Sequence, residues 1–102
     1  MTKTEKKKLL LELRTNESCR EELYYKTLET MGDLIGNYGD YMTTDSINCD
    51  EELKRLSEAD YELCAALLTM LLREDHFCNG SFERRCRNGQ IQPIIDRMIT
   101  LL

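Results

Sequence analysis

Apolar side chains recur at helical spacing through most of the chain, and the clearest run lies beyond its middle. Six apolar positions are separated alternately by one and three residues, the pattern of a helix with a buried face: Leu63, Cys64, Leu67, Leu68, Leu71 and Leu72. We predict that this main helix begins at Ser57, with Asp60 in its first turn, and stops at Asn79 and Gly80.

A second periodic stretch precedes it. Its apolar positions follow one another at steps of four and three residues: Tyr24, Leu28, Met31, Ile35 and Tyr38. Ser18 and Glu21 before this stretch have the spacing of a capping box. Gly32 and Gly36 leave its end open, because they either weaken a continuing helix, allow a close crossing, or mark an end near residue 32.

Shorter helices are predicted at both ends of the chain. Residues 3 to 14 place three leucines on one side with lysines around them, which predicts an amphipathic helix. After the main helix, Ser81 is expected to cap a short basic helix that ends at Asn88 and Gly89. Pro93 suits the first turn of a last helix, whose expected buried face is Ile91, Ile94, Ile95, Met98 and Leu102.

Residues 37 to 49 have no apolar period and many turn-forming residues, so they form the longest predicted loop. Tyr38 and Tyr41 in this loop are either interface anchors or side chains that fold back on the core, and we prefer the second interpretation. The three acidic residues 50 to 52 then suit a helix N-terminus.

The kinds of apolar residue decide the fold class. Leucine and methionine, which favour helices, are abundant, whereas valine and tryptophan are absent. The 102 residues suit one domain. We therefore predict an all-α fold, a compact bundle of about five helices in a single domain of residues 1–102, with residues 1–15 as a peripheral helix and residues 58–102 as the core.

Location is indicated by what the chain lacks. Its longest uncharged stretch, residues 63 to 72, is about half of a membrane span, and no secretion signal follows the first lysines. We expect a cytoplasmic protein without membrane contact. The five cysteines are odd in number and form no C-x-x-C pair, so we expect reduced thiols and no disulfide framework.

Charge is unevenly distributed within the net total of −5. Residues 12–62 carry fourteen acidic and five basic side chains, whereas the segments before and after them are positive or nearly neutral. An acidic surface attracts basic partners and repels nucleic acid, although charge alone is better explained by solubility. The candidate partner-binding residues on this surface are Glu51, Glu52, Glu58 and Glu62.

The chain offers little catalytic chemistry. His76 is its single histidine, and nothing around it resembles a nucleophile elbow or a phosphate-binding glycine loop. A zinc site would have to combine His76, Cys78 and Cys86 with Cys64 or Asp75 at an unusual spacing. We therefore expect no enzyme activity, no cofactor and no metal.

A motif can be recognised in residues 59–80 and 89–98. Arg73, Phe77 and Gly80 keep the spacing of an R-x-E-R-F-x-x-G signature, with His76 at the position of the second arginine. This pattern resembles a family of unknown function from Gram-positive bacteria and their mobile elements. The resemblance implies a bacterial cytosolic origin and carries no established activity.

The motif has a structural and a functional interpretation, and we prefer the structural one. In it, Phe77 packs under the turn, Gly80 supplies the left-handed residue after the helix, and Arg97 reaches back to Asp75 or Glu74. In the functional one, a binding surface is formed by Arg73, Asp75, His76, Arg84 and Arg97.

These observations lead us to expect a small acidic binding protein without catalysis, which inhibits a host-defence or nuclease complex on behalf of a mobile element. The alternative is a DNA-binding accessory protein that uses residues 81–97. The arginines there, Arg84, Arg85 and Arg87, are too close together to share one face, and we expect them to pair with the acidic middle of the same molecule. A third class is a homodimer that hides surplus apolar surface.

Overall fold

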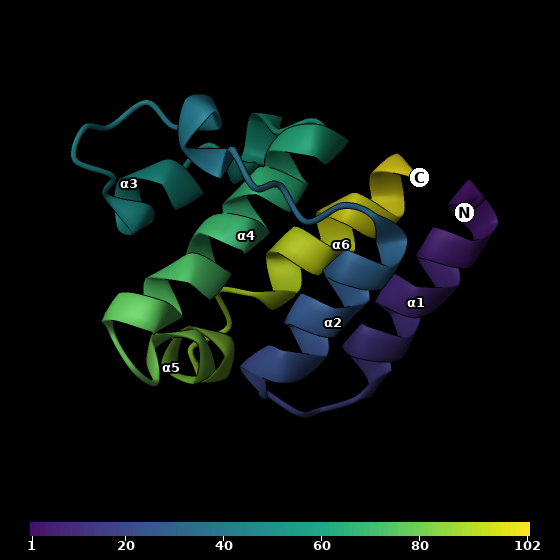
Figure 1. The fold of residues 1–102 in the computed structure, drawn as a ribbon. Coiled ribbons are helices and arrows are strands. Elements are labelled where there is room, and N and C mark those ends of the chain that lie inside the picture. The colour runs from purple at the N-terminus through teal and green to yellow at the C-terminus, as the bar shows by residue number, and fades with distance from the viewer.

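The main helix, α4 (Tyr61–Phe77), lies at the centre of a computed structural model that describes residues 1–102 (Figure 1). The Asp60 carboxylate accepts a hydrogen bond from the Leu63 N–H at 2.8 Å, so α4 begins at Tyr61 and not at Ser57. Ser57 belongs instead to a separate short helix, η2 (Leu56–Glu58), because Ala59 has extended backbone angles. Residues 64–72 are all buried, so α4 is enclosed on every side and is not amphipathic there.

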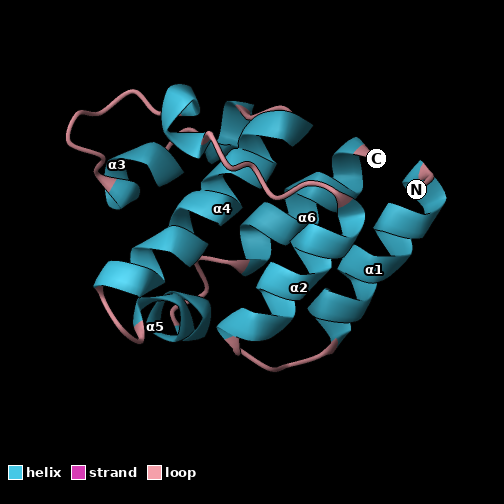
Figure 2. Cartoon of the chain, in the orientation of Figure 1, coloured by secondary structure: helices cyan, strands magenta, loops and turns pink.

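Five further α-helices surround α4, and the chain has no strand (Figure 2). They are α1 (Lys3–Thr15), α2 (Glu21–Met31), α3 (Cys49–Leu53), α5 (Ser81–Arg87) and α6 (Gln92–Leu101). The all-helical prediction is confirmed, but the count is six rather than about five. Helix α3 contains the acidic residues 50–52, which suited a helix N-terminus, and the Asn48 side chain caps it by accepting from the Glu51 N–H at 3.1 Å.

The helices form one compact globule in which α6 contacts both α1 and α4. Helices α1 and α2 run side by side in opposite directions, and both ends of the chain lie at the same end of the molecule (Figure 1). At the opposite end, α3 packs against α4, and α5 packs near the C-terminus of α4. The C-terminal half of α4 is therefore flanked by α3 and α5, and the loop before α3 lies at this same end.

The core confirms most of the predicted apolar positions. Leu10 of α1, Leu28 of α2 and Phe82 of α5 are fully buried, and the Tyr24 and Phe82 rings pack with centroids 5.0 Å apart. On the predicted face of α6, Ile91, Ile94, Ile95 and Met98 are buried, whereas Leu102 is only partly buried. No helix is both long and apolar enough to cross a membrane.

Several helix ends differ from the predicted caps. Arg20 precedes α2 without a side-chain cap, so the predicted capping box is wrong, and Ser18 Oγ accepts only from the Arg20 N–H at 3.3 Å. Helix α2 ends at Gly32, whose φ of 75° is left-handed. Of the three alternatives for the glycines, the structure therefore shows a helix end near residue 32. Gly80 also has a left-handed φ of 87°, as predicted, but it directly precedes α5 and leaves Ser81 inside that helix.

The long loop is partly ordered by a short helix, η1 (Tyr38–Tyr41), which contacts α4. Tyr38 is half-buried against the core, which confirms the preferred interpretation for that residue. The Tyr41 hydroxyl donates to the Glu62 carboxylate at 2.7 Å. Both tyrosines therefore tie the loop to α4.

Candidate functional site

A pocket of about 410 Å³ opens where the loop before α3, helix α3, the C-terminal half of α4 and helix α5 meet. Its walls include the apolar side chains of Tyr38, Ile47, Met70 and Phe77, and its charged residues are Asp50, Glu74 and Arg85. We name it the Phe77 pocket. Concave sites that combine apolar walls with a few convergent polar groups are the usual binding sites of proteins.

Three charged side chains that line the Phe77 pocket are bonded to one another. Arg85 Nε and Nη2 donate to the two Glu74 oxygens at 2.7 and 2.8 Å, and Arg85 Nη1 donates to Asp50 Oδ1 at 2.8 Å. Hydrogen bonding to Glu74 raises the pKa of Arg85, and bonding from Arg85 lowers the pKa values of Glu74 and Asp50. The cluster is therefore fully ionised near neutral pH and carries one net negative charge.

Arg85 confirms part of the prediction that the arginines of α5 pair with the acidic middle of the chain. Its side chain is only 7% exposed because Asp50 and Glu74 enclose it. Arg87 instead pairs with Glu83 in its own helix, and Arg84 is exposed. The three arginines thus do not form a common basic face.

Phe77 is exposed over 86% of its surface, so the prediction that it packs under the turn is wrong. It lies five residues after Leu72, off the apolar stripe of α4, and the chain turns away toward α5 immediately after it. The turn is closed by Asp75 instead, whose Oδ1 accepts from the Gly80 and Phe82 N–H groups at 3.1 Å each. Asp75 therefore has a structural role.

The rest of the motif cluster is not brought together. Arg97 Nε donates to the Ala59 carbonyl at 2.8 Å near the start of α4, so it does not reach Asp75 or Glu74. His76 is exposed and faces α2, beside Glu21 and Glu29. Arg73 is half-buried and Arg84 is exposed. Only Phe77 of the predicted cluster lines the Phe77 pocket.

Glu52 does not lie on the surface, unlike the other three predicted partner-binding acids. Its carboxylate is fully buried and accepts from the N–H of Thr43 at 3.1 Å and of Thr44 at 2.7 Å, from both threonine hydroxyls, and from Arg55 Nη1 at 2.9 Å. Burial alone would raise the pKa of Glu52, but the bonds from Thr44, Thr43 and Arg55 outweigh it and lower the pKa to about 2. Glu52 therefore closes the loop before α3.

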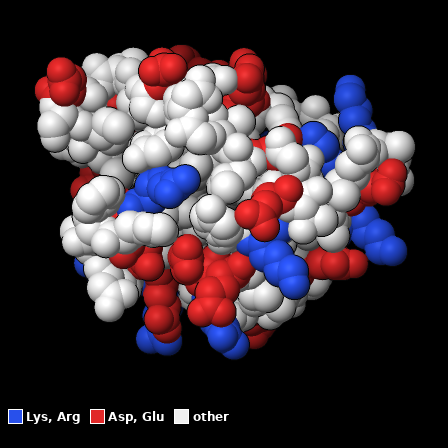
Figure 3. Space-filling model, viewed as in Figure 1, with Lys and Arg blue, Asp and Glu red and all other residues white.

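The remaining acids of residues 37–62 do form an exposed surface. Within this segment the only exposed basic residue is Lys54, whose ammonium lies 2.9 Å from Glu51. The exposed acids, which we name the acidic surface, are Asp40, Asp45, Asp50, Glu51, Glu58, Asp60 and Glu62. Figure 3 shows acidic side chains along the upper left and middle of the molecule's edge, whereas acidic and basic side chains are mixed at its right and over its lower part.

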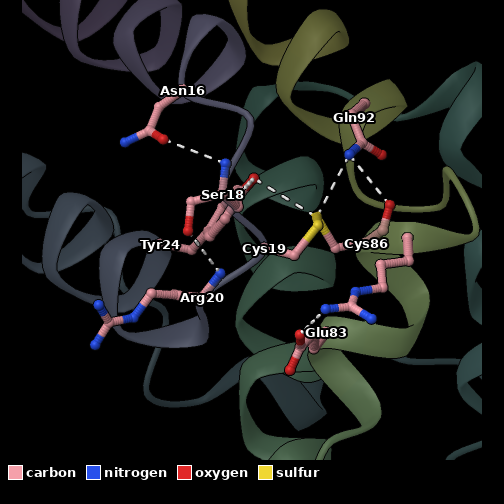
Figure 4. The surroundings of a disulfide bond; sticks show 9 residues. Asn16, Ser18, Cys19, Arg20, Tyr24, Glu83, Cys86 and Gln92 are labelled. Atoms are coloured by element: carbon pink, nitrogen blue, oxygen red, sulfur yellow. Dashed lines mark hydrogen bonds and ion pairs between the residues drawn. A yellow bond between two sulfur atoms is a disulfide. The ribbon is translucent and has the colours of Figure 1, made fainter.

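One disulfide joins Cys19 to Cys86, so the expectation of reduced thiols throughout is wrong (Figure 4). The fold brings the connection between α1 and α2 against α5, and the spacing of cysteines along the sequence contains no trace of this contact. The Gln92 amide donates to the Cys86 carbonyl at 3.2 Å, and the Tyr24 hydroxyl lies 3.9 Å from Cys86 Sγ.

Three cysteines remain free: Cys49, Cys64 and Cys78. Burial raises the pKa of Cys49 to about 12 and that of Cys64 to about 11, so both thiols stay protonated near neutral pH. No group of three or more His, Cys, Asp or Glu side chains is arranged to hold a metal ion.

The structure thus defines a small helical protein with an acidic surface beside a half-apolar pocket. Residues 23–102 match the model of a family of unknown function, DUF6508, and the chain belongs to this family. The match begins within α2 and leaves α1 outside it. No curated protein and no solved structure matches the chain.

Proposed function

We propose that this chain is a non-catalytic binding protein that docks its acidic surface on the basic surface of a protein partner. The observation that carries the proposal is that seven of the eight acids in residues 37–62 are exposed, against a single exposed lysine. Complementary charge of this kind accelerates association and selects partners of the opposite sign.

Inhibition is the form of docking that this surface supports best. Exposed carboxylates occupy the positions at which a nuclease or another nucleic-acid-binding protein receives phosphates, and they compete for the same basic side chains. The resemblance to a family carried by mobile elements favours a target in host defence. The proposal is therefore an inhibitor of a nuclease or defence complex.

DNA binding through residues 81–97 has less support. Arg85 is enclosed by Glu74 and Asp50, so only Arg84 and Arg87 of helix α5 remain near solvent. Arg87 is in addition paired with Glu83. The acidic surface in addition repels a polyanion. The DNA-binding interpretation stays a prediction that the following experiment tests.

The test is capture of partners by the tagged protein from a bacterial lysate, with and without nuclease treatment. One variant combines Glu51→Gln, Glu58→Gln and Glu62→Gln, all on the acidic surface. Its matched control combines Glu12→Gln, Glu17→Gln and Glu29→Gln, which remove the same charge from exposed positions on and near α1 and α2.

We expect a protein partner that survives nuclease treatment, is retained by the control and is lost with the acidic-surface variant. Equal capture by the two variants would show that net charge, or another surface, is responsible. Recovery that disappears on nuclease treatment would move the function to nucleic acid and to residues 81–97.

A further inference from the structure

We infer that the Phe77 pocket is the anchor point of the acidic surface and takes an arginine side chain that stands next to an apolar residue in a segment of the protein partner. This inference rests on the proposed function and names the chemistry that the docking surface recognises. It is carried by three features of the pocket: its exposed apolar rim, its net charge and its aromatic walls.

The pocket brings together two of the chain's exposed large apolar side chains. Five large apolar residues of the chain are exposed, and two of them, Phe77 and Ile47, line this pocket. Phe77 is the most exposed of the five and Ile47 is 39% exposed. The other three lie in or beside α1 and α6. Two exposed apolar side chains beside charged groups are typical of an interaction site, because water leaves such a surface when a partner covers it.

The charge of the pocket selects a cation. Two carboxylates, Glu74 and Asp50, face one guanidinium, that of Arg85. Arg85 occupies both oxygens of Glu74 but only Oδ1 of Asp50, and the Asp50 side chain is 73% exposed. Asp50 Oδ2 is therefore free to accept a hydrogen bond from an incoming donor.

An anionic ligand does not fit the same place. Nε, Nη1 and Nη2 of Arg85 all donate to Glu74 or Asp50 already, and its side chain is almost fully buried. A phosphate or carboxylate entering the pocket would meet the exposed carboxylate of Asp50 before the guanidinium. Repulsion between the two negative charges disfavours binding of such a ligand.

The walls favour arginine over lysine. The planar guanidinium of arginine stacks on aromatic rings, and Tyr38 and Phe77 provide two. Its apolar stem can lie along Ile47 and Met70 while its head reaches Asp50. An apolar neighbour of that arginine then covers the part of the Phe77 ring that the guanidinium leaves exposed.

The test uses short fluorescent peptides, with binding measured by fluorescence anisotropy and by nitrogen-15 NMR of the labelled protein. The probe alternates arginine with leucine. A second peptide replaces each arginine by lysine, and a third replaces it by uncharged citrulline, which has nearly the same shape. We expect amide shifts centred on Ile47, Asp50 and Phe77, with the arginine peptide binding most tightly.

Variants locate the binding. Phe77→Ala and Asp50→Asn each should weaken the arginine peptide about tenfold, the loss typical of an anchor contact. The matched controls are Leu11→Ala and Glu12→Gln, an exposed apolar and an exposed acidic position on α1, and they should change binding less than about twofold. Phe77 is exposed, and Asp50→Asn keeps an oxygen that can accept from Arg85, so neither variant removes a buried side chain or the contact with Arg85.

Three results would overturn the inference. Equal weakening by Phe77→Ala and Leu11→Ala would show that the pocket has no special role. Equal affinity for the arginine and lysine peptides would show charge attraction alone. Concentration-dependent self-association that Phe77→Ala abolishes would assign the pocket to a second copy of this chain.

The inference and the proposed function fail in different ways. If the triple acidic-surface variant loses the lysate partner while Phe77→Ala retains it, the docking surface stands and the pocket is not its anchor. If Phe77→Ala loses the partner and the triple variant retains it, the pocket binds without the acidic surface, and the proposed function is wrong.

Discussion

Residues 61–101 and residues 37–60 hold their shape by different forces. In the first region, which contains α4, α5 and α6, nearly every apolar position of the helical pattern is buried. In the second region only Glu52 and Ala59 are fully buried. Apolar side chains such as Tyr38 and Leu53 pack only partly against the core, and polar contacts supply much of what fixes the chain. Glu52 holds Thr43 and Thr44, and Arg85 holds Asp50.

The difference teaches which parts of this molecule can vary in shape. Burial of apolar surface is non-directional, so the helices of residues 61–101 are stabilised jointly by many contacts. Polar contacts are directional and few, so the loop depends on a handful of atoms. The Phe77 pocket lies between the two regions, with Phe77 and Met70 from the first and Ile47 and Asp50 from the second.

The largest effect should follow from a change in the apolar region. Phe82 is fully buried in α5 and packs on the Tyr24 ring, so Phe82→Ala leaves a cavity beside that ring. We expect a loss of about 4 kcal/mol in the free energy of unfolding, measured by urea denaturation. The exposed aromatic provides the control, since Phe77→Ala should cost less than about 0.5 kcal/mol. Similar losses at both positions would contradict the burial described above.

A smaller loss is expected where a covalent bond, rather than packing, ties the first residues to α5. The disulfide between Cys19 and Cys86 spans 67 residues of sequence, and it restricts the unfolded chain accordingly. Cys19→Ala should lower the free energy of unfolding by about 3 kcal/mol under oxidising conditions. Reductant should lower the stability of the original protein to that of the variant and leave the variant unchanged.

The matched control for that prediction is Cys78→Ala, because Cys78 is free and exposed. It should unfold like the original protein with and without reductant. If reductant has no effect on the original protein, the two thiols are not bonded in solution.

The fold was predictable from the sequence where a long apolar period existed. The stripe from Leu63 to Leu72 identified α4, and Pro93 with the isoleucines after it identified α6. Residue 77 falls outside the stripe, but it lies seven positions after Met70, on the same face of the helix. Because Met70 is buried, the period alone does not predict that Phe77 is exposed.

The candidate site was far less predictable, because its contacts join residues distant in the sequence. Asp50 and Arg85 are 35 residues apart, and no local pattern pairs them. Glu52 stands in a run of three acids, and nothing in the sequence distinguishes it from its exposed neighbours. Its carboxylate is nevertheless buried, because the backbone N–H groups of Thr43 and Thr44 donate to it. Ile47 was the one available signal for the pocket, as an isolated apolar residue in a polar loop.

The smallest of the three stability effects separates the regions by pH. Glu52→Gln should cost about 2 kcal/mol at pH 7, because it replaces an ionised acceptor of several hydrogen bonds by an amide. The folded-state pKa of Glu52, about 2, lies below its ordinary value of 4.5, so its contribution to stability is present above pH 4.5 and is lost as the pH falls toward 2. The difference between the original protein and the variant should therefore be constant from pH 7 down to about 5 and vanish near pH 2. Urea denaturation at each pH measures this difference.

Glu51→Gln, at the exposed neighbouring position, is the control and should change stability by less than about 0.5 kcal/mol at every pH. A pH-independent cost for Glu52→Gln would mean that the shape of the side chain matters and its charge does not, and the loop would then resemble the apolar region after all.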